Sequence, residues 1–324
     1  MVRSKVRTLY WSHLKAYEEC PRKYLWGYGW GDIDLGRGPG KGKPRPVEDS
    51  KHHAIMGIVI QAVLEDFYNK RMWTLPEMRG SELKRELVRM TKDKLLTTLA
   101  KPWLNVDYDK MSFEEIEETC ISGVVGYLST MRHHKLLGSY AKSEVELFGH
   151  ATNWLPIGGR ADFIIRRDDT GTTLLDGKNS GTKMKYVDPD QLRWYALCFS
   201  LAYHKLPNRL GFAWFRYPYD SETGEEGIDW VEFSKRDLRE LVERAIKVRR
   251  GQENEKFDPT PVAKNCRFCD FETVCDARIE QRAANAAKRK RKMPSLPIAD
   301  TDGITGIMEF GFGEMTVSKS GEGS

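Results

Sequence analysis

Three residues near the middle of the chain have the types and spacing that suit metal-assisted hydrolysis. Asp176 and Lys178 are two positions apart in the run LLDGK, and Asp162 lies in the preceding apolar run ADFII. Because the side chains of a strand alternate between its faces, Asp176 and Lys178 should point to the same side, with Gly177 between them. Asp162 reaches the same place if the two runs pair as a hairpin across residues 167–171.

Two carboxylates beside one amine favour a divalent cation. Hard oxygen ligands suit Mg²⁺ or Mn²⁺, which can activate a water molecule and stabilise the charge that develops on a phosphodiester under attack. Lys178 could orient that water or, if its amine is neutral, take a proton from it. The alternative for Asp176 and Lys178 is a surface ion pair at a strand end. It leaves Asp162 unexplained, because an unpaired carboxylate in an apolar run is costly to bury.

The helix expected after these strands has a clear start. Asp188 suits the N-cap, Pro189 suits the first helical position, and Gln191 falls where a capping box places its second member. Gln191 and Tyr195 then lie on one face, one turn apart. Both could face the acidic residues, or Gln191 could only cap the helix while Tyr195 only contributes to packing.

In this order, a strand with Asp, a strand with D-x-K and a capped helix with Q-x-x-x-Y resemble the PD-(D/E)xK nuclease superfamily, in particular its RecB-like branch. A single D-x-K occurs in many proteins, whereas the ordered set is much more specific. The resemblance implies an α/β, restriction-endonuclease-like core with a mixed central sheet flanked by helices. It also implies site roles: metal ligation by Asp162, Asp176 and the Gly177 carbonyl, water orientation by Lys178, and positioning of substrate or Lys178 by Gln191 and Tyr195.

One position departs from that branch, which carries a histidine metal ligand in G-x-x-x-H on a helix before the sheet. The matching run here is GIVIQ, which ends at Gln61. An amide is a poorer ligand than imidazole, so Gln61 could bind the metal weakly, act through water, or indicate reduced activity. Glu65, one turn further on the same face, could supply a carboxylate instead. Glu144 and Glu146 are further candidates, or simply charged residues of a half-exposed strand.

The cysteines give a second, independent signal. Cys266, Cys269 and Cys275 form C-x2-C-x5-C, and three thiolates at this spacing favour a metal. Cys20, at the end of a short helix that Ser12 could cap, is the candidate for the fourth ligand. Four thiolates suit either a structural zinc or a [4Fe-4S] cluster. The iron-sulfur nucleases of the RecB-like branch, such as CRISPR-associated and AddB-type enzymes, have one N-terminal cysteine before a proline and three C-terminal ones, so the resemblance implies the cluster.

Composition is consistent with a cytoplasmic protein. The chain has 324 residues, enough for one large domain or two modest ones, and a formal net charge of +5. No apolar run reaches membrane-spanning length, and the basic N-terminus lacks the apolar core of a signal peptide. Cys120 and Cys198 lie in patterns typical of buried cysteines, and a disulfide framework is not expected.

Two basic segments bear on domain organisation. Residues 36–46, GRGPGKGKPRP, should form a basic loop that either follows phosphates or acts as a solvated linker. Residues 288–292, KRKRK, should end the last helix and begin a disordered tail that could bind a protein partner. We therefore expect one nuclease domain over residues 1–280 and a basic tail over residues 281–324.

Hydrophobic periodicity gives a coarse map of helices before and after a short sheet. The expected helices cover residues 54–73, 81–99, 113–132 and 235–250, and the expected strands cover residues 143–148, 157–166, 172–178 and 209–217.

The sequence thus predicts a metal-dependent DNA nuclease, and the resemblance favours an exonuclease on single-stranded DNA or DNA ends. Two alternatives remain: a catalytically weakened DNA-binding module that retains fold and cluster, and a zinc-stabilised adaptor in which D-x-K is accidental. Aromatic residues of the N-terminal region could stack on bases, although core packing is the simpler role for most of them. They are Trp11, Tyr17, Tyr24, Trp26, Tyr28 and Trp30.

Overall fold

The structure is a computed structural model, and the chain forms two compact units, residues 1–278 and 279–324. The expected basic loop at 36–46 and the tail beyond Lys292 lie outside the described residues. The structure describes residues 7–30, 52–75, 80–101, 106, 108–137, 140–183, 187–267 and 269–292.

A mixed sheet forms the centre of the first unit. The strands follow the order β1-β3-β4-β5-β6, and β2 pairs with β3. Strand β3 is antiparallel to β2 and β4 and parallel to β1, while β4 is parallel to β5 and β5 antiparallel to β6. The strands are β1 (Leu9–Tyr10), β2 (Tyr140–Thr152), β3 (Leu155–Arg167), β4 (Gly171–Lys178), β5 (Arg209–Trp214) and β6 (Ile228–Val231).

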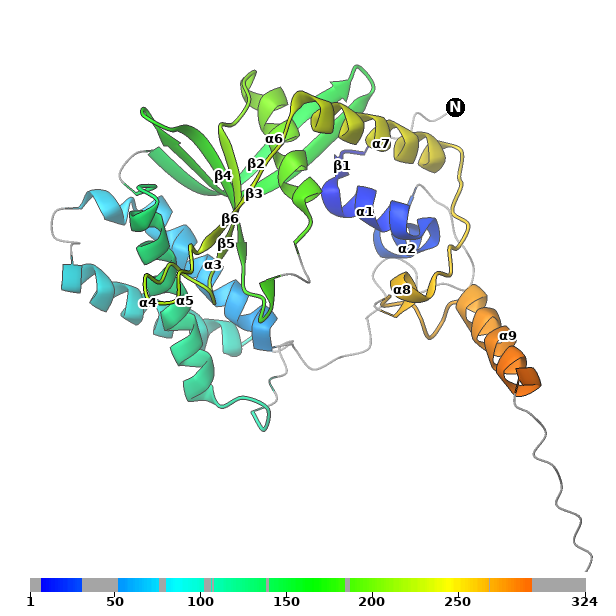
Figure 1. Cartoon of the computed structure of the whole chain (residues 1–324), viewed down its shortest axis with the longest axis horizontal. Helices are drawn as coiled ribbons and strands as arrows, with labels where there is room; N and C mark the ends of the chain where they lie inside the picture. Colours follow the sequence, from blue (N-terminus) through cyan, green and yellow to red (C-terminus); the bar gives the residue numbers. More distant parts are fainter. Residues whose placement is uncertain are drawn as a thin grey trace, which may run out of the picture. The chain divides into compact units, whose positions relative to one another are not determined.

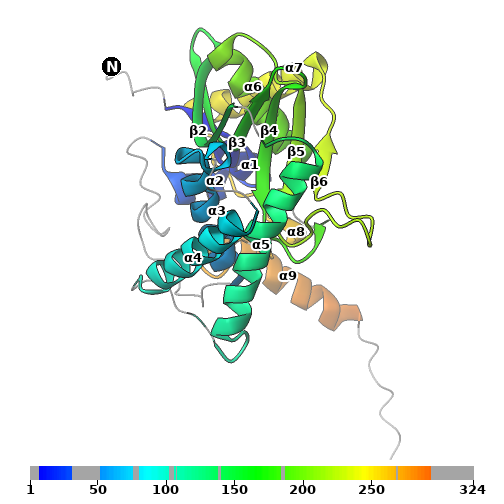
Figure 2. The same cartoon turned by 90° about the vertical axis from the view of Figure 1, so that its left-hand side faces the viewer.

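Helices cover both faces of this sheet (Figures 1 and 2), which confirms the expected α/β class. Alternating side chains of the strands assign the faces: Phe163 and Ile165 belong to one hydrophobic core, and Ile164 belongs to the other. The first core is completed by α3 (His52–Asn69), α4 (Gly80–Leu99) and α5 (Phe113–His133). The second is completed by α1 (Trp11–Glu19), α2 (Pro21–Tyr28), α6 (Pro189–Tyr203) and α7 (Lys235–Glu253).

Capping side chains begin several of the helices, but not α1. A capping box of Ser112 with Glu115 begins α5, and the Asp188 side chain caps α6. The expectation that Ser12 caps α1 is wrong, because the helix already begins at Trp11 and its N-cap, Tyr10, has no capping side chain. The chain enters α1 directly from the short strand β1, so Ser12 lies within the first turn.

The C-terminal part of the described chain is helical. The short helix α8 (Ala263–Cys266) precedes α9 (Asp276–Lys292), and the described part of the second unit is the remainder of α9. The 3₁₀ turn η1 (Met72–Thr74) follows α3. Within the described ranges, no helix combines the length and apolar character needed to cross a membrane.

Candidate active site

The β3–β4 hairpin brings the predicted acidic residues together. Continuing the register of the two strands by one position places Asp162 beside Asp176. The Gly177 backbone N–H donates a 2.8 Å hydrogen bond to Asp162 Oδ2. Asp176 is buried, and its Oδ2 lies 2.6 Å from Lys178 Nζ in an ion pair. Asp176 and Lys178 therefore belong to a largely buried site and do not form an exposed ion pair at a strand end.

The first turns of α6 complete this arrangement. Gln191 Nε2 donates to Asp176 Oδ1 at 2.9 Å and to the Tyr195 hydroxyl at 3.0 Å. Its Oε1 accepts from Lys178 Nζ at 3.2 Å. A capping role for the Gln191 side chain is wrong, because its amide instead bonds a buried acceptor, Asp176, and a half-buried donor, Lys178, in the hairpin. Gln191 thus fixes Asp176 and Lys178 relative to the helix.

A third carboxylate joins the site from β2. Glu144 lies opposite Asp162 in the β2–β3 register and has a φ of 51°, a left-handed conformation that is unfavourable for a non-glycine residue. Its Oε1 accepts from Gln61 Nε2 at 2.8 Å, and its Oε2 lies 2.7 Å from Arg160 Nε. Glu144, Asp162 and Asp176 therefore occupy three neighbouring strands, so Glu144 is more than a charged residue of a half-exposed strand.

Two cavities meet at these carboxylates. One, of about 480 Å³, is lined on the α3 side by Gln61 and Glu65 together with Glu144. The other, of about 370 Å³, is lined on the α6 side by Lys178 and Tyr195, among others. Asp162, Gly177 and Arg160 line both cavities. A phosphodiester could therefore approach the carboxylates from the side of either helix.

Burial and mutual repulsion disfavour the charged carboxylates. Burial, together with the negative charge of Asp176, raises the pKa of Asp162 to about 8, although the Gly177 N–H opposes the shift. Burial also raises the pKa of Asp176, against the opposing effect of the Lys178 ammonium. Carboxylates whose negative charges repel one another are a donor set that a hard divalent cation relieves, although the oxygens of Glu144, Asp162 and Asp176 do not all lie within 4.8 Å of one another.

Comparison with known proteins decides the family. Residues 10–276 match the model of the PD-(D/E)XK nuclease superfamily. This chain belongs to that superfamily. Among curated proteins there is no match. The chain is similar to a solved structure described as "Crystal structure of SSO0001", with 13% sequence identity and a TM-score of 0.31, over 69% of this chain and 85% of that chain.

Membership of the PD-(D/E)XK superfamily indicates a metal-dependent nuclease, because these enzymes use divalent cations such as Mg²⁺ or Mn²⁺. The fold also indicates DNA as the substrate. The acidic hairpin and the Gln191 amide thus lie in a chain whose family performs the chemistry expected from them.

A pH effect on stability follows from the raised pKa of Asp162. The folded chain retains this proton up to about pH 8, whereas the unfolded chain releases it near pH 3.8. Because the folded state binds more protons within this window, the contribution of Asp162 to stability should fall as pH rises from about 4 to about 8. Thermal melts of metal-free protein across this range should show the decline, and Mn²⁺ should reverse it most at the alkaline end.

Asp162→Asn is the control, because an amide cannot titrate in this window. The variant should show a flatter pH dependence than the wild type and little stabilisation by Mn²⁺. An unchanged dependence in Asp162→Asn would show that Asp162 has an ordinary titration in the folded nuclease.

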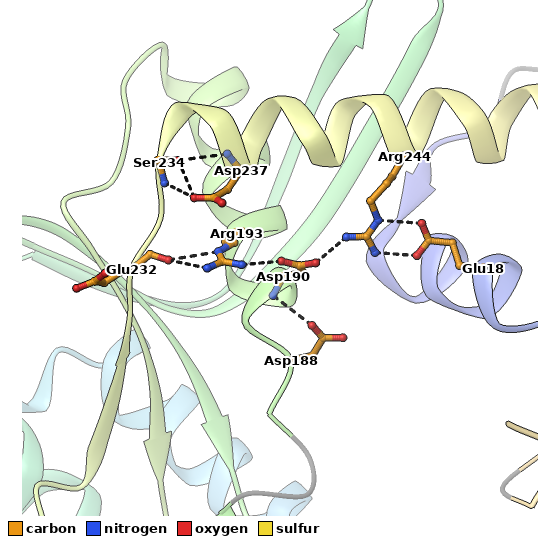
Figure 3. Close-up of polar contacts among 8 residues, drawn as sticks. All are labelled: Glu18, Asp188, Asp190, Arg193, Glu232, Ser234, Asp237 and Arg244. Atoms are coloured by element: carbon orange, nitrogen blue, oxygen red, sulfur yellow. Dashed lines mark hydrogen bonds and ion pairs between the residues drawn. The ribbon is translucent and has the colours of Figure 1, made fainter. Parts of the chain in front are cut away.

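Ion pairs hold α6 against its neighbours (Figure 3). Arg244 on α7 contacts Glu18 on α1 through two bonds, of 2.8 and 2.7 Å, and Asp190 on α6 at 2.6 Å. Arg193 joins Asp190, at 2.9 Å, to the backbone carbonyl of Glu232. Asp190 immediately precedes Gln191, so this network holds the end of α6 that carries the site amide.

The four predicted cysteines lie together in this nuclease. Cys20, Cys266, Cys269 and Cys275 line one pocket, and the Thr260 N–H donates to Cys20 Sγ at 3.4 Å. Burial raises the pKa of both Cys266 and Cys269 above the usual thiol range. The arrangement joins the N-terminal helices to the segment before α9.

The sulfur atoms of these four cysteines are not tightly clustered. Among the described residues, only His133, His134 and Glu226 bring three candidate ligand atoms within 4.8 Å of one another. No three of the cysteine sulfurs are that close. The other two cysteines, Cys120 and Cys198, are fully buried, as expected.

Sequence reasoning gave little weight to Glu144 and did not consider Arg160. The signal available for Arg160 was its position two residues before Asp162, on the same face of a strand. Glu146, the neighbouring candidate, is exposed and lines neither of the cavities at the site. Glu65 lines the cavity on the α3 side, as its spacing from Gln61 predicts.

Proposed function

We propose that the chain is a DNA exonuclease of the RecB-like branch, acting on single-stranded DNA or DNA ends. The observation that carries this proposal is the Gln191 side chain, which bonds Asp176, Lys178 and Tyr195 at once. It links the Q-x-x-x-Y helix to the D-x-K strand, and both motifs characterise the branch that the sequence resembles. The exonuclease preference comes from that resemblance.

In this proposal Asp162, Asp176 and Glu144 would hold the divalent cation, together with the Gly177 carbonyl. A cation held there would supply Lewis acidity and would lower the pKa of a water molecule. Lys178 orients the attacking water. Gln191 restricts the position of that amine, because its side-chain oxygen accepts a hydrogen bond from Lys178. Tyr195 in turn holds Gln191, because the Tyr195 hydroxyl accepts a hydrogen bond from the Gln191 amide nitrogen.

We also propose that the four cysteines hold a [4Fe-4S] cluster. Tetrahedral zinc, with Zn–S bonds of about 2.3 Å, would bring its thiolates within about 4 Å of one another. No three of the four sulfurs lie within 4.8 Å of one another. The choice of a cluster, whose thiolates bind different iron atoms, rests on the resemblance of the cysteine pattern to that of the iron-sulfur nucleases. Residues 1–280 would then form a single nuclease domain, with a basic tail over residues 281–324 that could contact a protein partner.

A catalytically weakened DNA-binding module is the second candidate, and Gln61 favours it. Its amide nitrogen donates to Glu144 Oε1, so Gln61 neutralises none of the negative charge and contributes no imidazole. In the enzyme, by contrast, Gln61 would hold Glu144 in position and could offer its amide oxygen to the cation as a weak ligand.

Gln61→His should preserve or raise metal-dependent cleavage, because imidazole is the better ligand and reaches a similar distance. Initial rates over a series of Mn²⁺ concentrations would measure this, and tighter apparent binding of Mn²⁺ is expected. Gln61→Ala, which removes the bond to Glu144, is the comparison and should weaken Mn²⁺ binding. Loss of activity in Gln61→His would assign the amide a specific role.

Degradation of end-labelled DNA tests the proposed function directly. With Mn²⁺, single-stranded DNA should shorten progressively from an end, and a covalently closed circle should remain intact. Rapid cutting of the circle would contradict the exonuclease proposal. Tight DNA binding without any cleavage would support the weakened module.

A further inference from the structure

A large cavity lies away from the three carboxylates. Its volume is about 510 Å³, and it is bordered by the start of β2, the β3–β4 hairpin and the C-terminal end of α6. Nothing in the catalytic proposal uses it. Aromatic rings and basic side chains dominate its lining, namely Tyr140, Lys142, Arg166, Phe199, Tyr203 and Lys205.

The aromatic residues form an exposed platform. Tyr203 is 48% exposed and Tyr140 is 46% exposed, whereas Phe199 is buried. The Phe199 and Tyr203 ring centroids are 4.7 Å apart at an interplanar angle of 36°. Phe199 therefore supports one side of Tyr203 and leaves the rest of that ring available for a planar ligand.

The basic side chains give the same cavity positive charge. Lys142 Nζ lies 5.4 Å from the Tyr140 ring centroid, and Arg166 and Lys205 are exposed. In the part of the chain that the structure describes, these three cations have no ion pair. Asp168 is the one acidic residue among the lining residues, which leaves an excess of two positive charges. An anionic ligand with a planar ring would satisfy both features.

The cavity lies on the same face of the sheet as the active site. Asp162 and Arg166 are four residues apart on β3, so their side chains share a face and are separated by roughly 13 Å. On α6, Gln191 and Tyr203 are twelve residues apart, roughly 18 Å along the helix. At about 3.4 Å per stacked nucleotide, roughly four or five nucleotides would span this distance.

We propose that this cavity binds a nucleotide of the DNA strand several positions from the bond being cleaved. The base stacks on Tyr203, and the flanking phosphates contact Lys142, Arg166 and Lys205. The inference rests on the proposed function and adds a subsite that holds the strand at a distance from the carboxylates. Such a subsite favours strands long enough to reach both places.

Binding of a fluorescently labelled single-stranded oligonucleotide to the full chain in EDTA tests the proposal without cleavage. Tyr203→Ala should weaken binding about tenfold, because it removes a stacking surface. Tyr203→Phe should bind like the wild type, because the ring remains. Lys205→Glu should weaken binding and lower the slope of log affinity against log salt by about 0.7.

Lys84→Glu is the matched control for charge, because Lys84 is also exposed but lies on α4, against the opposite face of the sheet. It should leave the affinity unchanged. Melting temperatures within experimental error of the wild type would show that the variants are folded. Equal affinities of wild type, Tyr203→Ala and Lys205→Glu would overturn the proposal.

Further measurements distinguish this proposal from the proposed nuclease activity and from binding of a free nucleotide. A dinucleotide too short to reach the cavity should be cleaved equally by wild type and Tyr203→Ala, whereas a longer strand should be cleaved more slowly by the variant at low concentration. Weaker strand binding by Tyr203→Ala in a protein that never cleaves DNA would support the cavity and contradict the nuclease. A mononucleotide that binds the wild type but not Tyr203→Ala, with strand affinity unaffected, would overturn the assignment to a strand.

Discussion

Lys178→Ala should abolish DNA cleavage while leaving DNA binding close to that of the wild type. In the proposed mechanism its amine positions the attacking water, and it is held by Asp176 at 2.6 Å and Gln191 at 3.2 Å. Loss of such a group should lower the rate of cleavage by about 10²–10⁴-fold. Asp176→Asn, which keeps the side-chain volume and removes the negative charge, should reduce cleavage at least as strongly because it removes a metal ligand.

Asp169→Asn is the matched control, because Asp169 is an exposed carboxylate in the turn of the same hairpin. Its rate should equal that of the wild type. Cleavage and oligonucleotide binding should be measured on the same preparations, so that loss of chemistry is separated from loss of affinity. A wild-type rate in Lys178→Ala or Asp176→Asn would show that the assigned site is wrong.

Protein purified without oxygen should be brown and contain iron and acid-labile sulfide, and Cys20→Ser should lose both. The same substitution should lower the melting temperature on the order of 10 °C, because the cluster would join segments that are far apart in sequence. Iron and sulfide analyses, visible absorption and thermal melts on the same samples would measure these effects.

Cys120→Ala is the control for the cluster, because it removes a thiol that is buried within α5 and does not line the cysteine pocket. Some loss of stability is expected from the cavity it creates, but iron and sulfide should remain. Colourless wild-type protein with stoichiometric zinc would contradict the cluster and favour a structural zinc.

Much of the candidate site could be predicted because its residues follow local rules. Alternation along a strand placed Asp176 and Lys178 on one face, and a turn of suitable length brought Asp162 beside them. The N-cap at Asp188 fixed the start of α6 and hence the common face of Gln191 and Tyr195.

Glu144 could not be assigned in the same way. Its position depends on a left-handed residue within β2 and on the register of β2 with β3, and neither is visible in the sequence around it. The role of Gln191 was also undecided, since capping and site contacts demand the same residue at the same position. Only the location of Asp176 and Lys178 separates the two interpretations.

The parts of the fold that escaped prediction are the shortest ones. Strand β1 has two residues and β6 has four, which is too few for a periodic pattern, and their pairing depends on strands distant in sequence. The strand expected to reach Tyr217 ends at Trp214. Strand β2 instead extends well beyond the six residues expected, because β3 pairs with it along nearly its whole length.

The cysteine pocket limits when this part of the protein can fold during its synthesis on the ribosome. Cys20 is made long before Thr260, since their contact spans 240 residues, and the other three cysteines of the pocket are made later still. Closing a loop of that length costs roughly 5 kcal/mol of chain entropy, so the pocket should form only after the sheet has brought both segments near. During translation α1 and α2 therefore cannot complete the pocket until α7 and α8 have been made, and insertion of the proposed cluster would follow the folding of the sheet.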